Sequence, residues 1–107
     1  MVNRVIRWAR NPYLGEGIED WKEIRTKVNK GDFLPTIFLV TLSNHPDHVL
    51  EFIPSFMLRQ KWNRKTCSKI VGIAKGKKEA MNLVADIVRE VYENTGAVEI
   101  REYLKKR

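Results

Sequence analysis

The sequence predicts a small two-layer α/β or α+β domain, in which a short sheet is covered by helices. Three observations lead to this prediction. The chain has only 107 residues, two segments have strand composition, and several others carry apolar stripes of helical period. Apolar residues make up 43% and charged residues 31% of the chain, against averages of about 45–50% and 25%. We therefore expect residues 1–107 to form a single domain with one thin core.

Two segments are the expected strands, at 36–42 and 69–74. The first reads TIFLVTL, is rich in β-branched and aromatic residues, and is apolar on both faces. Such a strand usually lies inside a sheet that helices cover on both sides. A strand–crossover–strand unit predicts that the two strands pair in parallel. Because two strands make a weak sheet, we expect further strands near 49–53 or 98–100, or a second copy of the chain that completes the sheet.

Three helices are expected to cover this sheet, near 18–30, 77–94 and 98–104. The first has an apolar stripe, acidic residues in its first turn, and Gly31 after its last turn, where a capping glycine belongs. The second has a broad apolar stripe and ends before Gly96. That stripe comprises Ala80, Met81, Val84, Ile87, Val88, Val91 and Tyr92.

The two ends of the chain and the segment 49–62 are read from weaker patterns. Residues 2–10 fit a short basic helix, so 1–16 is interpreted as an N-terminal basic helix and connector. Segment 49–62 fits a helix that Pro54 breaks, which we favour, and also an extended strand after a hairpin turn. Residues 105–107 are expected to be a frayed basic tail.

Several protein classes are excluded. One cysteine excludes a disulfide scaffold, and the most apolar stretch, 33–42, is about half the ~20 residues of a membrane-spanning helix. Arginines interrupt any signal-peptide core near the N-terminus. We therefore expect a cytoplasmic protein, not a membrane protein, in which Cys67 is an inert side chain.

One run of sequence also resembles known sequences. The segment Ile70–Ala80 (IVGIAKGKKEA), with VYENTG at 91–96, resembles small hypothetical proteins of about this length from bacterial genomes. The resemblance covers about 36–104. It implies a bacterial, cytoplasmic origin and no particular site.

The positive charge is concentrated in one block, 59–78. This block holds eight basic and no acidic residues, whereas the net charge of the whole chain is +7. Cations beside an aromatic ring are what a nucleic-acid surface needs, although a charge run is more often a solvated face. The candidate basic and aromatic surface comprises Arg59, Lys61, Trp62, Arg64 and Lys65. The expected consequence is weak, salt-sensitive binding to polyanions or to an acidic protein.

The second candidate site is the connection between the strand at 69–74 and the helix at 77–94. Backbone N–H groups at a helix start attract anions, and lysines strengthen this attraction. The spacing matches neither a Walker A loop nor G-x-G-x-x-G. A strand-to-helix turn with solvated lysines is the alternative interpretation. The residues that would bind a phosphate or a carboxylate there are Gly72, Lys75, Gly76, Lys77 and Lys78.

A third candidate site follows the first strand, where His45, Asp47 and His48 lie within four residues. Open α/β sheets place ligands at such strand ends, but no second cluster completes a metal site. No residue pattern typical of a catalytic site is present, so no catalytic residue, metal or cofactor is predicted.

The sequence favours a non-enzymatic binding or interaction module that uses a basic surface on an anionic partner, with a homodimer expected. A small enzyme or ligand-binding protein with its anion site at 72–78 is the first alternative. A structural subunit of an assembly is the second.

Overall fold

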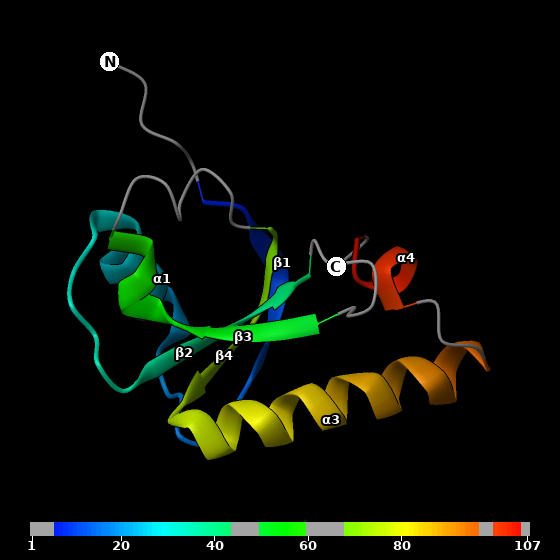
Figure 1. The fold of residues 1–107 in the computed structure, drawn as a ribbon. Coiled ribbons are helices and arrows are strands. Elements are labelled where there is room, and N and C mark those ends of the chain that lie inside the picture. Colours follow the sequence, from blue (N-terminus) through cyan, green and yellow to red (C-terminus); the bar gives the residue numbers. More distant parts are fainter. Residues whose placement is uncertain (1–5, 44–49, 60–67, 97–99, 106–107) are drawn as a thin grey trace.

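In a computed structural model the chain forms a mixed sheet with helices packed on it (Figure 1). The structure describes residues 6–43, 50–59, 68–96 and 100–105. Its elements, in chain order, are β1 (Trp8–Leu14), α1 (Trp21–Lys30), β2 (Ile37–Leu42), β3 (Leu50–Pro54), the 3₁₀ helix η1 (Ser55–Arg59), β4 (Ile70–Lys75), α3 (Lys77–Thr95) and α4 (Ile100–Lys105). The small α+β fold is confirmed, and so are the strands near 36–42 and 69–74 and the helices near 18–30 and 77–94.

The sheet has four strands in the order β1-β4-β2-β3. The predicted parallel pairing of the two central strands is wrong, because β2 and β4 are antiparallel. β3 is also antiparallel to β2. β3 and β4 therefore run in the same direction, one on each side of β2. The parallel pair in the sheet is β1 with β4.

The favoured broken helix at 49–62 is also wrong over its described part. Residues 50–54 form β3, as in the alternative interpretation, and η1 follows. Pro54 is tolerated because it ends a strand at the edge of the sheet, where a missing N–H leaves no neighbouring strand unpaired. The apolar residues and Pro54 fit a broken helix and a strand equally well, and pairing with β2 selects the strand.

The predicted N-terminal helix is replaced by a strand over its described C-terminal part. Residues 8–14 form β1, and 1–5 lie outside the described residues. Pro12 breaks a helix, and it is accommodated in β1 because β1 is the other edge strand. The register of β1 on β4 shifts between Trp8 and Tyr13, around this proline.

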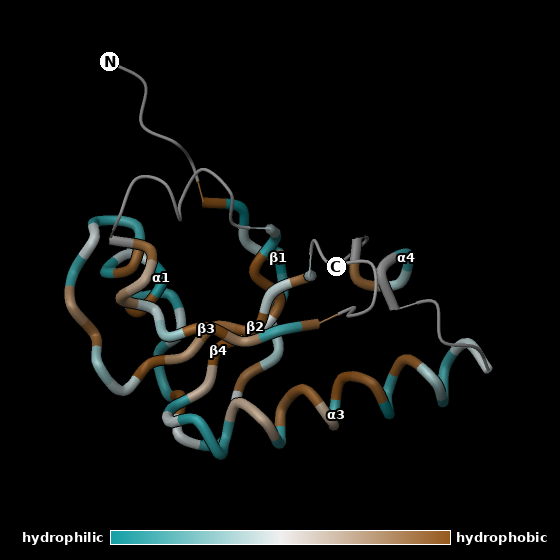
Figure 2. Tube along the Cα trace, in the orientation of Figure 1, coloured by the Kyte–Doolittle hydropathy of each residue, from teal (hydrophilic) through white to brown (hydrophobic). Residues whose placement is uncertain are grey.

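Apolar side chains pack on both faces of the sheet, so the helices form two layers around it rather than one. On one face Ile37 and Leu39 of β2 pack with Val28 of α1 and Leu58 of η1. On the other face α3 and α4 cover the alternate strand residues. That second cluster includes Val40, Val71, Ala74, Leu83, Ile87, Val91 and Leu104. Figure 2 shows hydrophobic residues concentrated in the strands and recurring along α3.

Four of the seven residues in the predicted apolar stripe of α3 pack in the core, and the other three are exposed. Ala80, Ile87 and Val91 are fully buried and Val84 is partly buried, while Leu83 joins them. No helix within the described part of the chain combines the length and the hydropathy that crossing a membrane requires.

Candidate functional site

The turn between β4 and α3 depends on a glycine. Gly76 has φ +88° and ψ 155°, a region that only glycine adopts without strain. Its N–H donates to the carbonyl of Thr36 at 2.7 Å, which ties the turn to the residue before β2. A Cβ at this position would meet no atom within 4 Å, so the need for glycine is conformational rather than steric.

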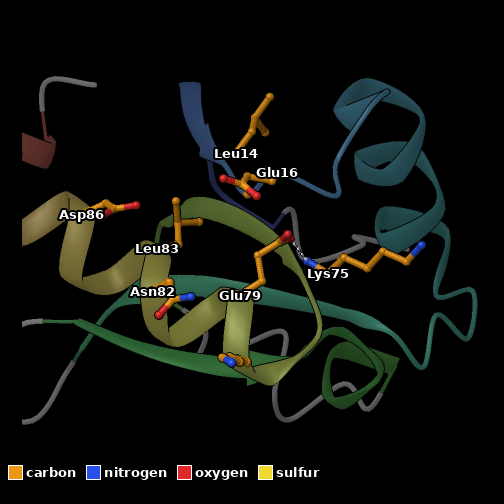
Figure 3. Close-up of a pocket in the computed structure, with 9 residues that line it drawn as sticks. Leu14, Glu16, Lys75, Glu79, Asn82, Leu83 and Asp86 are labelled. Carbon is orange, nitrogen blue, oxygen red and sulfur yellow. Dashed lines mark hydrogen bonds between the residues drawn. The ribbon is translucent and has the colours of Figure 1, made fainter.

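The carboxylate of Glu79, in the first turn of α3, fastens this turn to the loop after β1. It accepts the N–H of Gly17 at 2.8 Å and also the N–H of Lys75. Figure 3 shows the Glu79 side chain directed at the Lys75 backbone, with the Lys75 side chain extending away from it. Gly15 makes room for this carboxylate, since a Cβ there would lie 2.3 Å from Glu79 Oε2.

The five residues of the predicted anion site do not all lie together. Lys75, Gly76, Lys77 and Lys78 lie together at the start of α3, but Gly72 lies inside β4, buried under the helix. A Cβ on Gly72 would be 3.0 Å from Leu83 Cδ2, so this glycine permits close helix packing. The Lys75 N–H, a donor that an external anion would use, already binds a carboxylate of the chain itself.

A shallow cavity of about 400 Å³ opens beside this turn, between the loop after β1 and one flank of α3. Its walls carry both signs of charge, and Asp86 is paired with Arg89 at 3.1 Å. The lining residues are Leu14, Gly15, Glu16, Lys75, Lys78, Glu79, Asn82, Leu83 and Asp86. This mixture of charges gives the cavity no clear preference for an anion or a cation.

Three cations stand exposed at this end of the helix. We call Lys75, Lys77 and Lys78 the lysine end of α3. None of the three forms an ion pair with a carboxylate in the described ranges. Lys77 and Lys78 also lie at the positive end of the helix dipole, where cations are unfavourable. This part of the charged block is therefore uncompensated within the described domain.

An apolar stripe runs along α3 beside the lysine end, and it is exposed although the sequence assigned most of it to the core. Met81 is 54%, Val88 37% and Tyr92 58% exposed, and Ala85 is also exposed. We call these four residues the α3 stripe. The exposure of this stripe could have been expected from the sequence, because the apolar residues of α3 cover a wider arc of the helix than one face of a sheet can bury.

The other predicted sites fall largely outside the described residues. His45, Asp47, His48, Lys61, Trp62, Arg64, Lys65 and Cys67 all lie there, and Arg59 is described only as the end of η1. Trp8, the first residue of β1, donates its indole N–H to Asn29 Oδ1 at 2.9 Å and packs against the core. Within the described ranges no group of three or more His, Cys, Asp or Glu residues is arranged to hold a metal ion.

Comparisons with known proteins found no similar protein. No family model, no curated protein and no solved structure matches this chain.

Proposed function

We propose that the chain is a non-enzymatic interaction module whose basic surface binds an acidic protein partner. The observation that carries the proposal is the position of the lysine end of α3 directly beside the α3 stripe. The lysines attract an acidic partner, and the stripe supplies the apolar contact area that a protein interface needs. Nucleic-acid interfaces are more polar and more strongly positive than this combination.

The alternative of a small-anion site at 72–78 has less support. Glu79 already occupies the Lys75 and Gly17 N–H groups, and Gly76 donates to Thr36. A phosphate would have to displace a carboxylate that is covalently part of the same turn. The side chains of Lys75, Lys77 and Lys78, in contrast, are exposed and available to a larger partner.

Fluorescence anisotropy with labelled polyglutamate tests the proposal. The variant Lys75→Gln/Lys77→Gln/Lys78→Gln loses three positive charges at the proposed surface. The control Arg10→Gln/Lys22→Gln/Lys30→Gln loses three exposed charges on β1 and α1. We expect the first variant to weaken binding about tenfold and the control less than about twofold, because attraction between exposed charges is short-ranged in salt.

Equal losses in the two variants would mean that only overall charge matters and would overturn the proposal. A single-stranded oligonucleotide of equal charge serves as the comparison ligand. Tighter binding to the oligonucleotide than to polyglutamate, lost with the same three lysines, would replace the acidic protein by a nucleic acid.

A further inference from the structure

We infer that the acidic partner binds as an amphipathic helix, which packs its apolar side along the α3 stripe and sets its carboxylates against the cations of α3. This inference rests on the proposed function and states the chemistry of the partner. The stripe residues are spaced four, three and four residues apart, which is the spacing at which one helix packs along another. At about 1.5 Å per residue, the stripe from Met81 to Tyr92 extends about 16 Å, or about three turns of a partner helix.

The cations of α3 border this stripe on both sides. Successive residues of a helix are about 100° apart, so Lys77 and Lys78 lie about 50° to either side of the middle of the stripe. Arg89 lies about 70° from the middle, on the same side as Lys78. All three residues are exposed, and Arg89 also pairs with Asp86. A partner helix on the stripe therefore meets positive charge along both of its margins.

The acidic residues of α3 lie on the rest of its surface. Each is more than about 100° from the middle of the stripe, and they are Glu79, Asp86, Glu90 and Glu93. Glu79 and Glu90 hydrogen bond to the β1 side of the domain. This separation of charge makes the stripe complementary to an acidic helix. A second copy of this chain fits the surface poorly, because its own stripe has the same bordering cations.

Sheet residues beside the stripe are also apolar and only partly covered. The stripe lies on the β3 side of α3, since the hydrogen bonds of the opposite flank lead to β1 and the loop after it. Leu50 and Phe52 of β3 and Phe38 of β2 pack in the cluster under α3, and all three are only partly buried. Glu51 and Ile53 alternate with them along β3 and face the α1 side, where Ile53 packs. A helix lying along α3 on this side would cover apolar side chains of the stripe and of the sheet.

An added strand is a weaker alternative to a helix at this edge. β3 has only five residues, exposes Glu51, and ends at Pro54. Short length, a charge and a proline are the features by which natural edge strands avoid pairing with another chain. The exposed apolar area belongs to α3, so we assign the contact to helix packing.

A membrane surface is also a weaker alternative. Helices that lie in a membrane interface bury an apolar face rich in tryptophan, phenylalanine or leucine. The α3 stripe has none of these residue types and includes Ala85. The larger apolar face of α3, with Leu83 and Ile87, is already buried against the sheet. A partner helix therefore fits this narrow stripe better than a lipid surface does.

Fluorescence anisotropy with a designed peptide tests the inference. The probe is a labelled helical peptide of about five turns, with leucines at the spacing of the stripe and glutamates on both sides of them. A scrambled peptide of the same composition keeps the charge and loses the apolar stripe. We expect the amphipathic peptide to bind the full chain about tenfold more tightly than the scrambled one, because only the amphipathic peptide buries the α3 stripe.

Two variants separate the stripe from the charge. Met81→Gln/Tyr92→Gln removes apolar contacts at both ends of the stripe and leaves the charge unchanged. We expect it to weaken the amphipathic peptide about tenfold and polyglutamate less than about twofold, since only the peptide uses the stripe. Circular dichroism and Tm are expected to stay close to wild type, because both side chains are exposed. Phe33→Gln, at an apolar residue elsewhere that is 57% exposed, is the control and is expected to leave both ligands unchanged.

The failure of this inference differs from the failure of the proposed function. A chain that binds polyglutamate through its lysine end, but binds both peptides equally, has an acidic partner that does not pack on the stripe, which overturns this inference alone. Binding of polyglutamate that does not depend on the lysines overturns both.

The remaining outcomes concern another occupant of the stripe. A dimer in sedimentation equilibrium that Met81→Gln/Tyr92→Gln dissociates would assign the stripe to a second copy. Binding to phosphatidylserine vesicles that the same variant abolishes, and that exceeds binding to the peptide, would assign it to a membrane. Either result overturns the inference.

Discussion

The helices α1 and α3 lie on opposite faces of the same sheet, and only α1 follows the local rules for a stable helix. The side chain of Asp20 caps its first turn by accepting the N–H of Glu23 at 3.2 Å. Glu23 lies in the first turn and Lys27 and Lys30 in the last, as the helix dipole favours. Its C-terminal cap is Gly31 in the left-handed conformation.

α3 shares the glycine cap, at Gly96, and an acidic residue in the first turn, Glu79. It begins at Gly76 without a side-chain cap, follows with two lysines, and has no basic residue in its last turn. It also exposes a second apolar stripe that α1 does not have. The comparison teaches that a helix which only covers the core can satisfy every local rule. Departures from those rules tend to lie where a surface has another role, and here they lie in α3.

The largest expected difference between the two helices is in core packing. Ile87→Ala on α3 is expected to lower the free energy of unfolding by about 2–5 kcal/mol, because the side chain is fully buried. Ile24→Ala on α1 is expected to cost less than half as much, since Ile24 is only partly buried. Urea unfolding of both variants measures the difference. A loss below about 0.5 kcal/mol for Ile87→Ala would remove α3 from the core.

The next difference is at two glycines with positive φ. Gly76→Ala forces alanine into φ +88°, ψ 155°, and is expected to cost about 2 kcal/mol. Gly31→Ala requires only the left-handed helical region, φ 83° and ψ 21°, and is expected to cost about 1 kcal/mol. The Tm values of the two variants at equal concentration check the order. Equal losses would show that the turn before α3 is not strained.

These positions also show how far the sequence predicts the fold. The period-3.6 stripes and the following glycines located both ends of α3 and the C-terminal end of α1 to within one residue, whereas α1 begins at Trp21 and not near 18. Strand order was not predictable, because the return of β3 and the pairing of β1 depend on tertiary contacts and not on local pattern. β1 was not predicted and β3 was only the alternative interpretation of its segment; both strands contain a proline, which is permitted because each lies at an edge of the sheet.

The candidate site was predictable only in part. Lysines 75, 77 and 78 were identified from charge alone, and they do lie together. The role of Glu79 was not predicted, because its hydrogen bond to Gly17 joins residues 62 positions apart. Val88 and Tyr92 were assigned to the core because periodicity marks apolar residues but does not show how wide an arc the sheet can cover.

A smaller effect is expected from the two helix starts. Glu79→Ala removes the acceptor for two backbone N–H groups and is expected to cost about 1 kcal/mol, since Glu79 is only half-buried. Asp20→Ala removes a conventional N-cap and is expected to cost a similar ~1 kcal/mol. Amide hydrogen exchange separates the two variants. Glu79→Ala is expected to raise exchange at Gly17, in the loop after β1, whereas Asp20→Ala is expected to raise it at Glu23 alone. Unchanged exchange at Gly17 would contradict the link between the two loops.

The smallest effect is the sharpest test of the comparison, because its sign differs between the helices. Lys30→Gln removes a cation from the C-terminal end of α1 and is expected to lower stability by about 0.3–1 kcal/mol. Lys78→Gln removes a cation from the N-terminal end of α3, so in the monomer it is expected to raise stability by a similar amount. Urea unfolding at low micromolar concentration keeps association from contributing, and added salt is expected to shrink both shifts. A destabilising Lys78→Gln in the dilute monomer would mean that this lysine stabilises the domain that carries it. In that case the positive charge of the lysine end would be explained by the stability of the domain and would not indicate binding to a partner.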